Sequence, residues 1–169
     1  MTRTTTTVRA RSVVVTAGLA GLIVGILVGA AFQQSAVAQQ SKSGRRAIHP
    51  EKSPNTGLPY SPGILVGNTL YVSGNLGRDP VSAKLVPGGI EAETRQSLAN
   101  IRETLKAAGM DFKDVVNVTA YIANFNDFEK FNAVYREYFP TDPPARATVQ
   151  VAALNMGAKI ELQMIAVKP

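Results

Sequence analysis

The side chains best suited to chemistry are an arginine and a glutamate on the last two expected strands. Arg146 follows Pro143 and Pro144, whose rings restrict the direction in which the chain enters the strand. A guanidinium held in this way can bind a carboxylate through two parallel hydrogen bonds. Read alone, an arginine at the start of a strand is also an ordinary solvated residue.

Glu161 lies among apolar residues on the final strand. Such surroundings raise the pKa of a carboxyl and suit it to handling water. A structural ion pair or an exposed strand position would explain this residue too. If the last two strands pair as a hairpin about residues 155–157, Arg146 and Glu161 are offset by about five residues, or roughly 16 Å. They need not share one subunit's pocket.

A third candidate is the Ser73-Gly74-Asn75 tripeptide, which ends the second expected strand. The hydroxyl and the amide could orient a small substrate, and Gly74 would let a ligand approach the backbone. Ordinary turn chemistry at a strand end is the alternative. Ser73 has no histidine partner, so the sequence does not indicate a serine hydrolase.

Composition excludes several classes of site. The chain has no Cys and a single His, His49, so thiol nucleophiles, disulfides and Cys- or His-rich metal centres are not expected. The net charge is +6, but without residues 1–38 the chain has 15 basic and 12 acidic residues, a balance of only +3. Aromatic residues are not interleaved with clustered Lys or Arg. We therefore predict no specific nucleic-acid partner.

The N-terminus has the features of an export signal. Residues 13–32 are uncharged and apolar, three arginines precede them, and Ala36-Val37-Ala38 offers a small-x-small cleavage pattern. The apolar run is also long enough to cross a bilayer, so residues 1–38 are interpreted as a signal peptide or a membrane anchor. Either reading places the remainder on the outer side of the cytoplasmic membrane, periplasmic, extracellular or tethered through residues 13–32. Residues 39–57 are polar and are interpreted as a flexible linker.

Residues 58–169 predict one α/β (α+β) domain. Two short β-type runs flank the turn dipeptide Gly67-Asn68, and Phe128, Phe131, Tyr135 and Tyr138 recur at helical spacing, which favours a core-facing helix. Asn126 and Glu129 resemble a capping box at its start. The order is β-β-α-β-α-β-β, with strands at 63–66, 69–73, 115–123, 146–153 and 159–167 and helices at 91–108 and from 126 to the residue before Pro140.

Two helices can cover only one face of such a sheet. Alternation along the last two strands separates apolar residues from two polar rows: Arg146, Thr148 and Gln150, and Lys159, Glu161 and Gln163. These polar rows indicate a face that meets water, a ligand or another subunit.

The segments PYSPGILVGNTLYVSGNLGRDP (59–80), VVNVTAYIANFNDFEKFNAVYREYFP (115–140) and above all PARATVQVAALNMGAKIEL (144–162) resemble the Rid, or YjgF-like, family. The resemblance covers essentially all of residues 57–168. It implies a chorismate-mutase-like fold with a mixed sheet and two helices on one face. It also implies a homotrimer with small-molecule clefts between subunits.

Deaminating members of that family hydrolyse reactive enamines and imines to a 2-oxo acid and ammonia without a cofactor. By resemblance Arg146 would bind the substrate carboxylate and Glu161 would position or activate water, while Tyr60, Ser73 and Asn124 match cleft-lining positions. Departures at Asn75, Thr148 and Leu162 concern substrate range. The alternative function is a non-catalytic ligand-binding or chaperone-like trimer that uses the same clefts.

Overall fold

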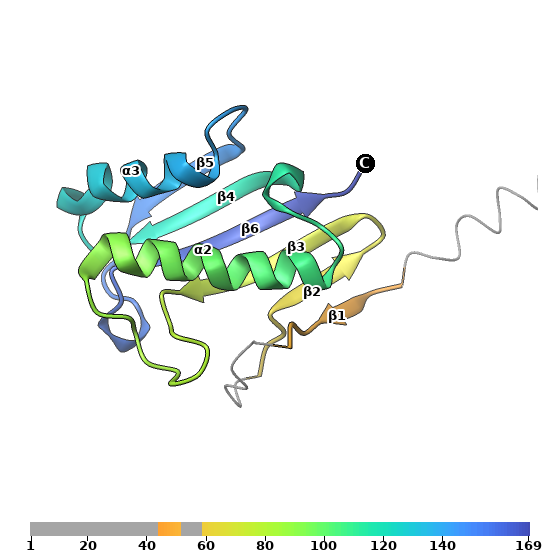
Figure 1. The fold of residues 1–169 in the computed structure, drawn as a ribbon, viewed down its shortest axis with the longest axis horizontal. Helices are drawn as coiled ribbons and strands as arrows, with labels where there is room; N and C mark the ends of the chain where they lie inside the picture. The colour runs from red at the N-terminus through yellow and green to blue at the C-terminus, as the bar shows by residue number, and fades with distance from the viewer. Residues whose placement is uncertain (1–43, 52–58) are drawn as a thin grey trace, which may run out of the picture. The chain divides into compact units, whose positions relative to one another are not determined.

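Six strands form one mixed sheet in the computed structural model, which describes residues 44–51 and 59–169. The strand order across the sheet is β1-β2-β3-β6-β4-β5, as Figure 1 shows. All neighbours are antiparallel except β4 and β5, which are parallel. The strands are β1 (Arg46–Ile48), β2 (Gly63–Val66), β3 (Thr69–Leu76), β4 (Val115–Ile122), β5 (Ala145–Gln150) and β6 (Ile160–Val167).

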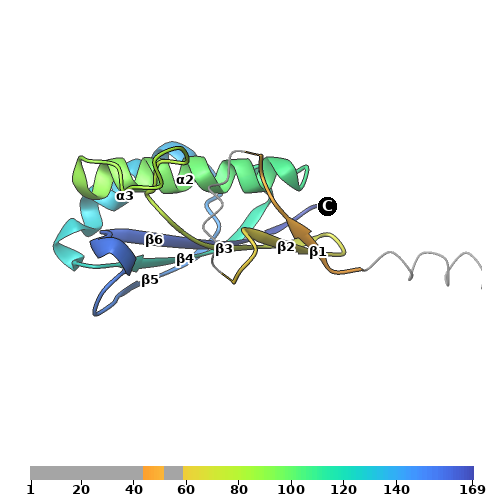
Figure 2. The same ribbon diagram turned by 90° about the horizontal axis from the view of Figure 1, so that it is seen from below.

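Helices α2 (Gly89–Ala107) and α3 (Phe128–Tyr138) lie on the same side of the sheet (Figure 2). Each helix presents an apolar face to the strands because its apolar residues recur every three or four positions. The buried residues of the helices include Leu98, Ile101, Leu105, Phe131 and Val134. They pack on the central strands, where Val118, Ile122, Ile160, Leu162 and Met164 are almost completely buried. Single 3-10 turns occur at Phe112–Asp114, Phe125–Asp127 and Asn155–Gly157.

From residue 63 onward, the predicted order β-β-α-β-α-β-β is confirmed, as is the placement of both helices on one face. The β2–β3 turn contains Gly67 at a φ of 59°, a conformation that glycine adopts without steric cost. Capping of the second helix was predicted incorrectly. The Asn124 side chain accepts a hydrogen bond from the Asn126 backbone N–H and caps the preceding 3-10 turn, and α3 begins two residues later.

The flexible linker expected at 39–57 is wrong for the residues of β1. Ile48 is only 2% exposed and pairs with Gly63 of β2, so β1 is part of the folded sheet. A three-residue strand with one buried apolar side chain has too little alternation for a sequence pattern to detect. Residues 39–43 and 52–57 of the expected linker, and the export segment at 1–38, lie outside the described residues.

The hairpin expected between the last two strands is also wrong. β4 lies between them, pairing with β5 on one side and with β6 on the other. The face of β5 differs from the expectation as well: Arg146 pairs with Val118 and Thr148 with Ala120, and both partners are buried beneath the helices. The polar row of β5, which contains Arg146 and Thr148, therefore lies on the helix side of the sheet. Aromatic and amide side chains of α3 contact Arg146 there and allow a charged residue on this face.

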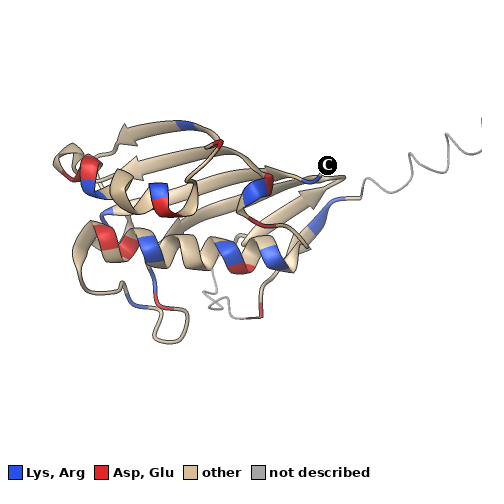
Figure 3. Cartoon of the chain, turned by 45° about the horizontal axis from the view of Figure 1, so that its top comes forward, with Lys and Arg blue, Asp and Glu red and all other residues tan. Residues whose placement is uncertain are grey.

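The polar row of β6 lies where the alternation predicted, on the sheet face away from the helices. Figure 3 shows Lys and Arg interspersed with Asp and Glu along both helices. Within residues 44–51 and 59–169, no helix is long and apolar enough to traverse a lipid bilayer.

Candidate active site

A cavity of about 520 Å³ lies where the end of β3 approaches the C-terminal half of α2 and the beginning of β6. It brings together five residues predicted from the sequence: Tyr60, Ser73, Gly74, Asn75 and Glu161. Residues that the sequence analysis did not select also line it, among them Arg78, Gln96, Asn100 and Asn155. Their roles depend on packing between distant segments, for which the sequence carries no local signal.

A bulge in β3 shapes this cavity. Val72 pairs with Met164 and Asn75 with Leu162, so Ser73 and Gly74 together oppose the single β6 residue between those partners. An extra residue bends a strand and re-aims its side chains, which is why bulges are common beside active sites. Ser73 donates its hydroxyl proton to the Ser61 carbonyl at 2.6 Å. With its proton used in this way, the hydroxyl oxygen can only accept a further hydrogen bond.

Glu161 occupies the space that a side chain at position 74 would need. An ideal Cβ built on Gly74 would lie 1.9 Å from a Glu161 carboxylate oxygen and 2.9 Å from the carboxyl carbon. Only glycine allows this approach. Burial raises the pKa of Glu161, because removal of the carboxyl from water disfavours its charged form. Neither ion pair among the described residues involves Glu161.

Arg146 lies outside the cavity, against α3. Its Nη2 donates a hydrogen bond to Oδ1 of Asn132 at 2.8 Å. Its guanidinium carbon is 4.5 Å from the ring centroid of Tyr135 and 5.0 Å from that of Phe131. Within the described residues no carboxylate forms an ion pair with it. Arg146 is thus a partly buried cation held by neutral groups.

Two hydroxyl oxygens close to Arg146 in the fold are buried without a hydrogen-bond partner in the described part of the chain: that of Tyr135 and that of Thr148. Burial raises the pKa of Tyr135 to about 12, and the nearby positive charge of Arg146 opposes this only partly. Tyr135 is therefore neutral at physiological pH and does not neutralise Arg146. The aromatic stripe on α3 was interpreted as core; it is core, and it also contacts the candidate carboxylate-binding arginine.

Arg146 and Glu161 face opposite sides of the sheet. Arg146 pairs with Val118 on the helix side, whereas Glu161 pairs with Tyr121, whose side chain is on the open side. The two positions are separated by three residues along β4 and by two strand spacings, which places their Cα atoms roughly 14 Å apart. One small substrate cannot contact both side chains of the same chain.

Asn124, the remaining predicted substrate-binding residue, is exposed and caps the turn before α3. It does not line the cavity, and its contact with substrate stays a prediction. Asn132 and Tyr135 were not selected from the sequence, although their spacing from Phe128 and Phe131 places all four on one helical face. The described residues contain no group of three or more His, Cys, Asp or Glu arranged to hold a metal ion.

Comparison with known proteins gives consistent matches over the folded part of the chain. The chain is 51% identical to the 2-iminobutanoate/2-iminopropanoate deaminase of Capra hircus over 124 residues, which are 73% of this chain and 90% of the relative. It is 47% identical to the human protein of that name, with the same coverage. A RutC family protein from Sulfurisphaera tokodaii is 46% identical over 72% of this chain and 97% of its own length.

Solved structures match with similar coverage. RidA from the Antarctic bacterium Psychrobacter has a TM-score of 0.70 at 36% identity, covering 73% of this chain and 99% of that one. Escherichia coli TdcF, solved with bound serine, has a TM-score of 0.70 at 31% identity with the same coverage. The family model described as endoribonuclease L-PSP matches residues 50–168. With the fold, the bulged cavity and these matches in agreement, the chain belongs to the Rid (YjgF-like) family.

Proposed function

We propose that this protein hydrolyses 2-imino acids and their enamine tautomers to 2-oxo acids and ammonia. The observation that carries this function is that two partly buried ionisable side chains, Arg146 and Glu161, form no ion pair within the described residues, on a fold shared with deaminases at about half identity. Buried charges are normally paired, so an arginine held only by neutral groups is ready to receive an anion from outside the chain.

Arg146 binds the substrate carboxylate. Asn132 occupies one of the five guanidinium N–H groups, and the remaining donors can form the two parallel hydrogen bonds that a carboxylate accepts. Binding in this way fixes the imine carbon relative to the water that attacks it. Because an imine is already electrophilic, orientation supplies a large share of the acceleration and no cofactor is required.

Glu161 acts as the general base and acid in the reaction with water. The substrate reacts as the protonated imine: water oxygen forms a bond to the imine carbon, the Glu161 carboxylate takes one proton from that water, and the electron pair of the C=N bond moves to nitrogen, which gives a neutral carbinolamine. Glu161 then gives its proton to the amino nitrogen. The C–N bond breaks with its electron pair on the departing ammonia, the hydroxyl oxygen forms the C=O bond of the 2-oxo acid, and the hydroxyl proton is released to solvent. The raised pKa of Glu161 suits both transfers, because a general base is most effective near the working pH.

The site is completed between subunits of a homotrimer. Support comes from the opposite orientations of Arg146 and Glu161, since both can reach one substrate only if different copies supply them. The open face of the sheet also exposes Tyr71 and Val149, apolar surface that a neighbouring copy would cover. Light scattering of residues 39–169 should give a mass near three times that of the monomer. A monomeric result would remove the shared site.

The protein acts outside the cytoplasmic membrane. Support comes from the sequence, which has an uncharged run at 13–32, arginines before it, and the Ala36-Val37-Ala38 pattern after it. A reporter fused after Pro169 should be protected from a cytoplasmic protease. Degradation of the reporter would overturn the export proposal without affecting the enzymatic one.

The decisive experiment times the loss of freshly generated 2-iminopropanoate in the presence of residues 39–169. Arg146→Ala and Glu161→Ala should each lower kcat/KM by about 10²- to 10³-fold, the range expected for a lost charged hydrogen bond or general base. Arg136→Ala and Glu129→Ala are the matched controls, since both residues are exposed on α3. A wild-type rate equal to that of buffer with several imino acids would favour a non-catalytic binding protein.

A further inference from the structure

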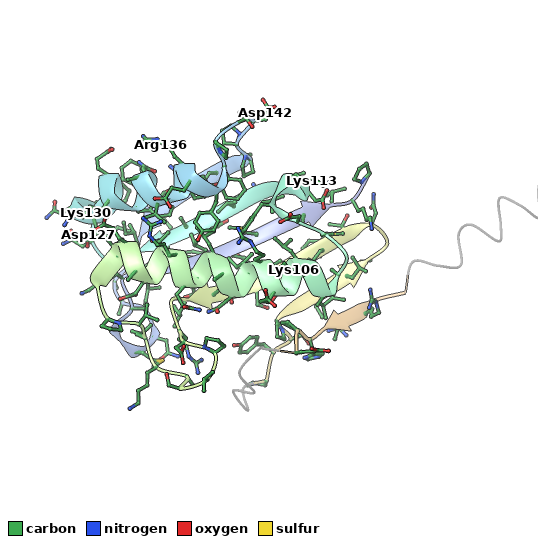
Figure 4. All side chains as sticks on the ribbon, viewed as in Figure 1. Lys106, Lys113, Asp127, Lys130, Arg136 and Asp142 are labelled. Carbon is green, nitrogen blue, oxygen red and sulfur yellow. The ribbon has the colours of Figure 1, made fainter. Side chains whose placement is uncertain are left out.

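Helix α3 turns four side chains toward Arg146: Phe128, Phe131, Asn132 and Tyr135. Their spacing of three, one and three residues places them on one face of the helix. The guanidinium carbon lies 5.9, 5.0 and 4.5 Å from the ring centroids of Phe128, Phe131 and Tyr135, in that order. The charged residues Lys130 and Arg136 of the same helix are exposed and extend outward from it (Figure 4).

These contacts restrain the guanidinium. Aromatic rings attract a cation through their electron-rich faces, so the three rings define where the guanidinium can rest. Asn132 accepts a single N–H, which fixes rotation about the end of the side chain. The other N–H donors make no hydrogen bond within the described residues and are left for a ligand.

We propose that Tyr135 is a positioning residue, whose ring holds the Arg146 guanidinium so that its unused N–H groups meet the substrate carboxylate as a preformed fork. The inference rests on the proposed function, in which Arg146 binds that carboxylate. Tyr135 is selected because it has the closest ring to the guanidinium and is itself held by the ring of Phe139, at 4.6 Å between centroids.

The chemistry of Tyr135 suits this task. Its side chain is 5% exposed, so the interaction with Arg146 is weakened little by water. With a pKa of about 12 it stays neutral, so it holds the guanidinium without becoming a competing anion. A glutamate or aspartate at this place would pair with Arg146 and exclude the substrate carboxylate.

The mechanism predicts a specific kinetic signature. Without the ring the guanidinium is in the binding position for a smaller fraction of the time, but substrate that does bind meets the same fork and has the same orientation toward water. Loss of the ring therefore weakens binding without slowing the chemical step. Tyr135→Leu in the full-length chain should therefore raise KM for 2-iminopropanoate about five- to tenfold, with kcat within about twofold of wild type. Tyr135→Phe restores the ring and should return KM to within about twofold of wild type.

Phe112→Leu is the matched control. Phe112 is a buried ring that packs against another arginine, Arg102, at 5.1 Å, and belongs to the same aromatic cluster. Phe112→Leu removes about as much buried aromatic surface as Tyr135→Leu, but it leaves the rings around Arg146 in place. The KM of Phe112→Leu should therefore equal that of wild type. Should Tyr135→Leu fail to fold, Tyr135→Met fills the space without an aromatic face and takes its place.

Calorimetric binding of 2-oxobutanoate to the same variants separates this inference from the proposed reaction. A wild type that binds 2-oxobutanoate but hydrolyses no imine would refute the deaminase function, and the Kd of Tyr135→Leu, expected to be about five- to tenfold weaker, would still test positioning. Equal KM and Kd in Tyr135→Leu and wild type would overturn the inference, as would an equal increase in Phe112→Leu. A wild type that neither binds nor hydrolyses would overturn both proposals.

Discussion

Substitution of Gly74 by alanine should displace the Glu161 carboxylate while leaving the fold intact. The added Cβ would lie 1.9 Å from a carboxylate oxygen, and ordinary contact begins at about 3.4 Å. The oxygen must therefore move by about 1.5 Å. The three heavy atoms nearest to this Cβ all belong to the Glu161 side chain, whose end is flexible. The side chain, rather than the backbone of the sheet, yields.

Gly74→Ala should have a large effect on kcat and a small effect on the free energy of unfolding. Misplacement of a catalytic group by about 1 Å can cost about 10²-fold in rate, so kcat should fall by at least about 10²-fold, or about 2.7 kcal/mol of transition-state stabilisation. The free energy of unfolding should change by less than about 1 kcal/mol, because alanine is favoured over glycine inside a strand and offsets part of the strain.

Initial rates of 2-iminopropanoate hydrolysis, with urea unfolding at a fixed protein concentration, measure both effects. The decisive comparison is the double variant Gly74→Ala/Glu161→Ala, in which the collision no longer exists. If Gly74 acts only through Glu161, the double variant is no slower than Glu161→Ala alone. A double variant that is a further tenfold slower, or a Gly74→Ala protein with wild-type kcat, would refute the reasoning.

Three further predictions concern stability. Burial raises the pKa of Glu161 in the folded chain, so the contribution of this carboxyl to stability is present below the ordinary glutamate pKa and is lost as pH rises through the raised value. The difference in Tm between Glu161→Gln and wild type should therefore grow, in favour of the variant, from about pH 4 to about pH 8. A difference that stays constant with pH would contradict the shift. Thr148→Val removes a buried hydroxyl that has no hydrogen-bond partner among residues 44–51 and 59–169, and it should add about 1 kcal/mol to the free energy of unfolding in urea. A loss of stability would mean that the hydroxyl is hydrogen-bonded in the assembled protein. Ile48→Ala should cost about 2–4 kcal/mol in the same assay, whereas no effect would mean that β1 does not belong to the folded sheet.

Only some residues of the candidate site could be predicted from the sequence. Ser73, Gly74 and Glu161 could be selected because their types and strand positions are readable locally, and the structure gathers them with Tyr60 in one cavity. Asn132 and Tyr135 could not, because an asparagine and a tyrosine on an apolar helical face have the pattern of ordinary core residues. Only their contact with Arg146, on a strand reached after Pro143 and Pro144, distinguishes them.

The sequence by itself determined the order of the strands and helices from 63 to 167, the apolar faces of both helices and the polar row of β6. Those features depend on periodicity and turn residues, which act over a few neighbouring positions. Tertiary structure alone decided that β6 inserts between β3 and β4, that Arg146 turns toward α3, and that Arg146 and Glu161 face opposite sides of the sheet. Pairing between strands distant in the chain is selected by the packing of the whole core, and no local pattern along a single strand encodes its neighbours.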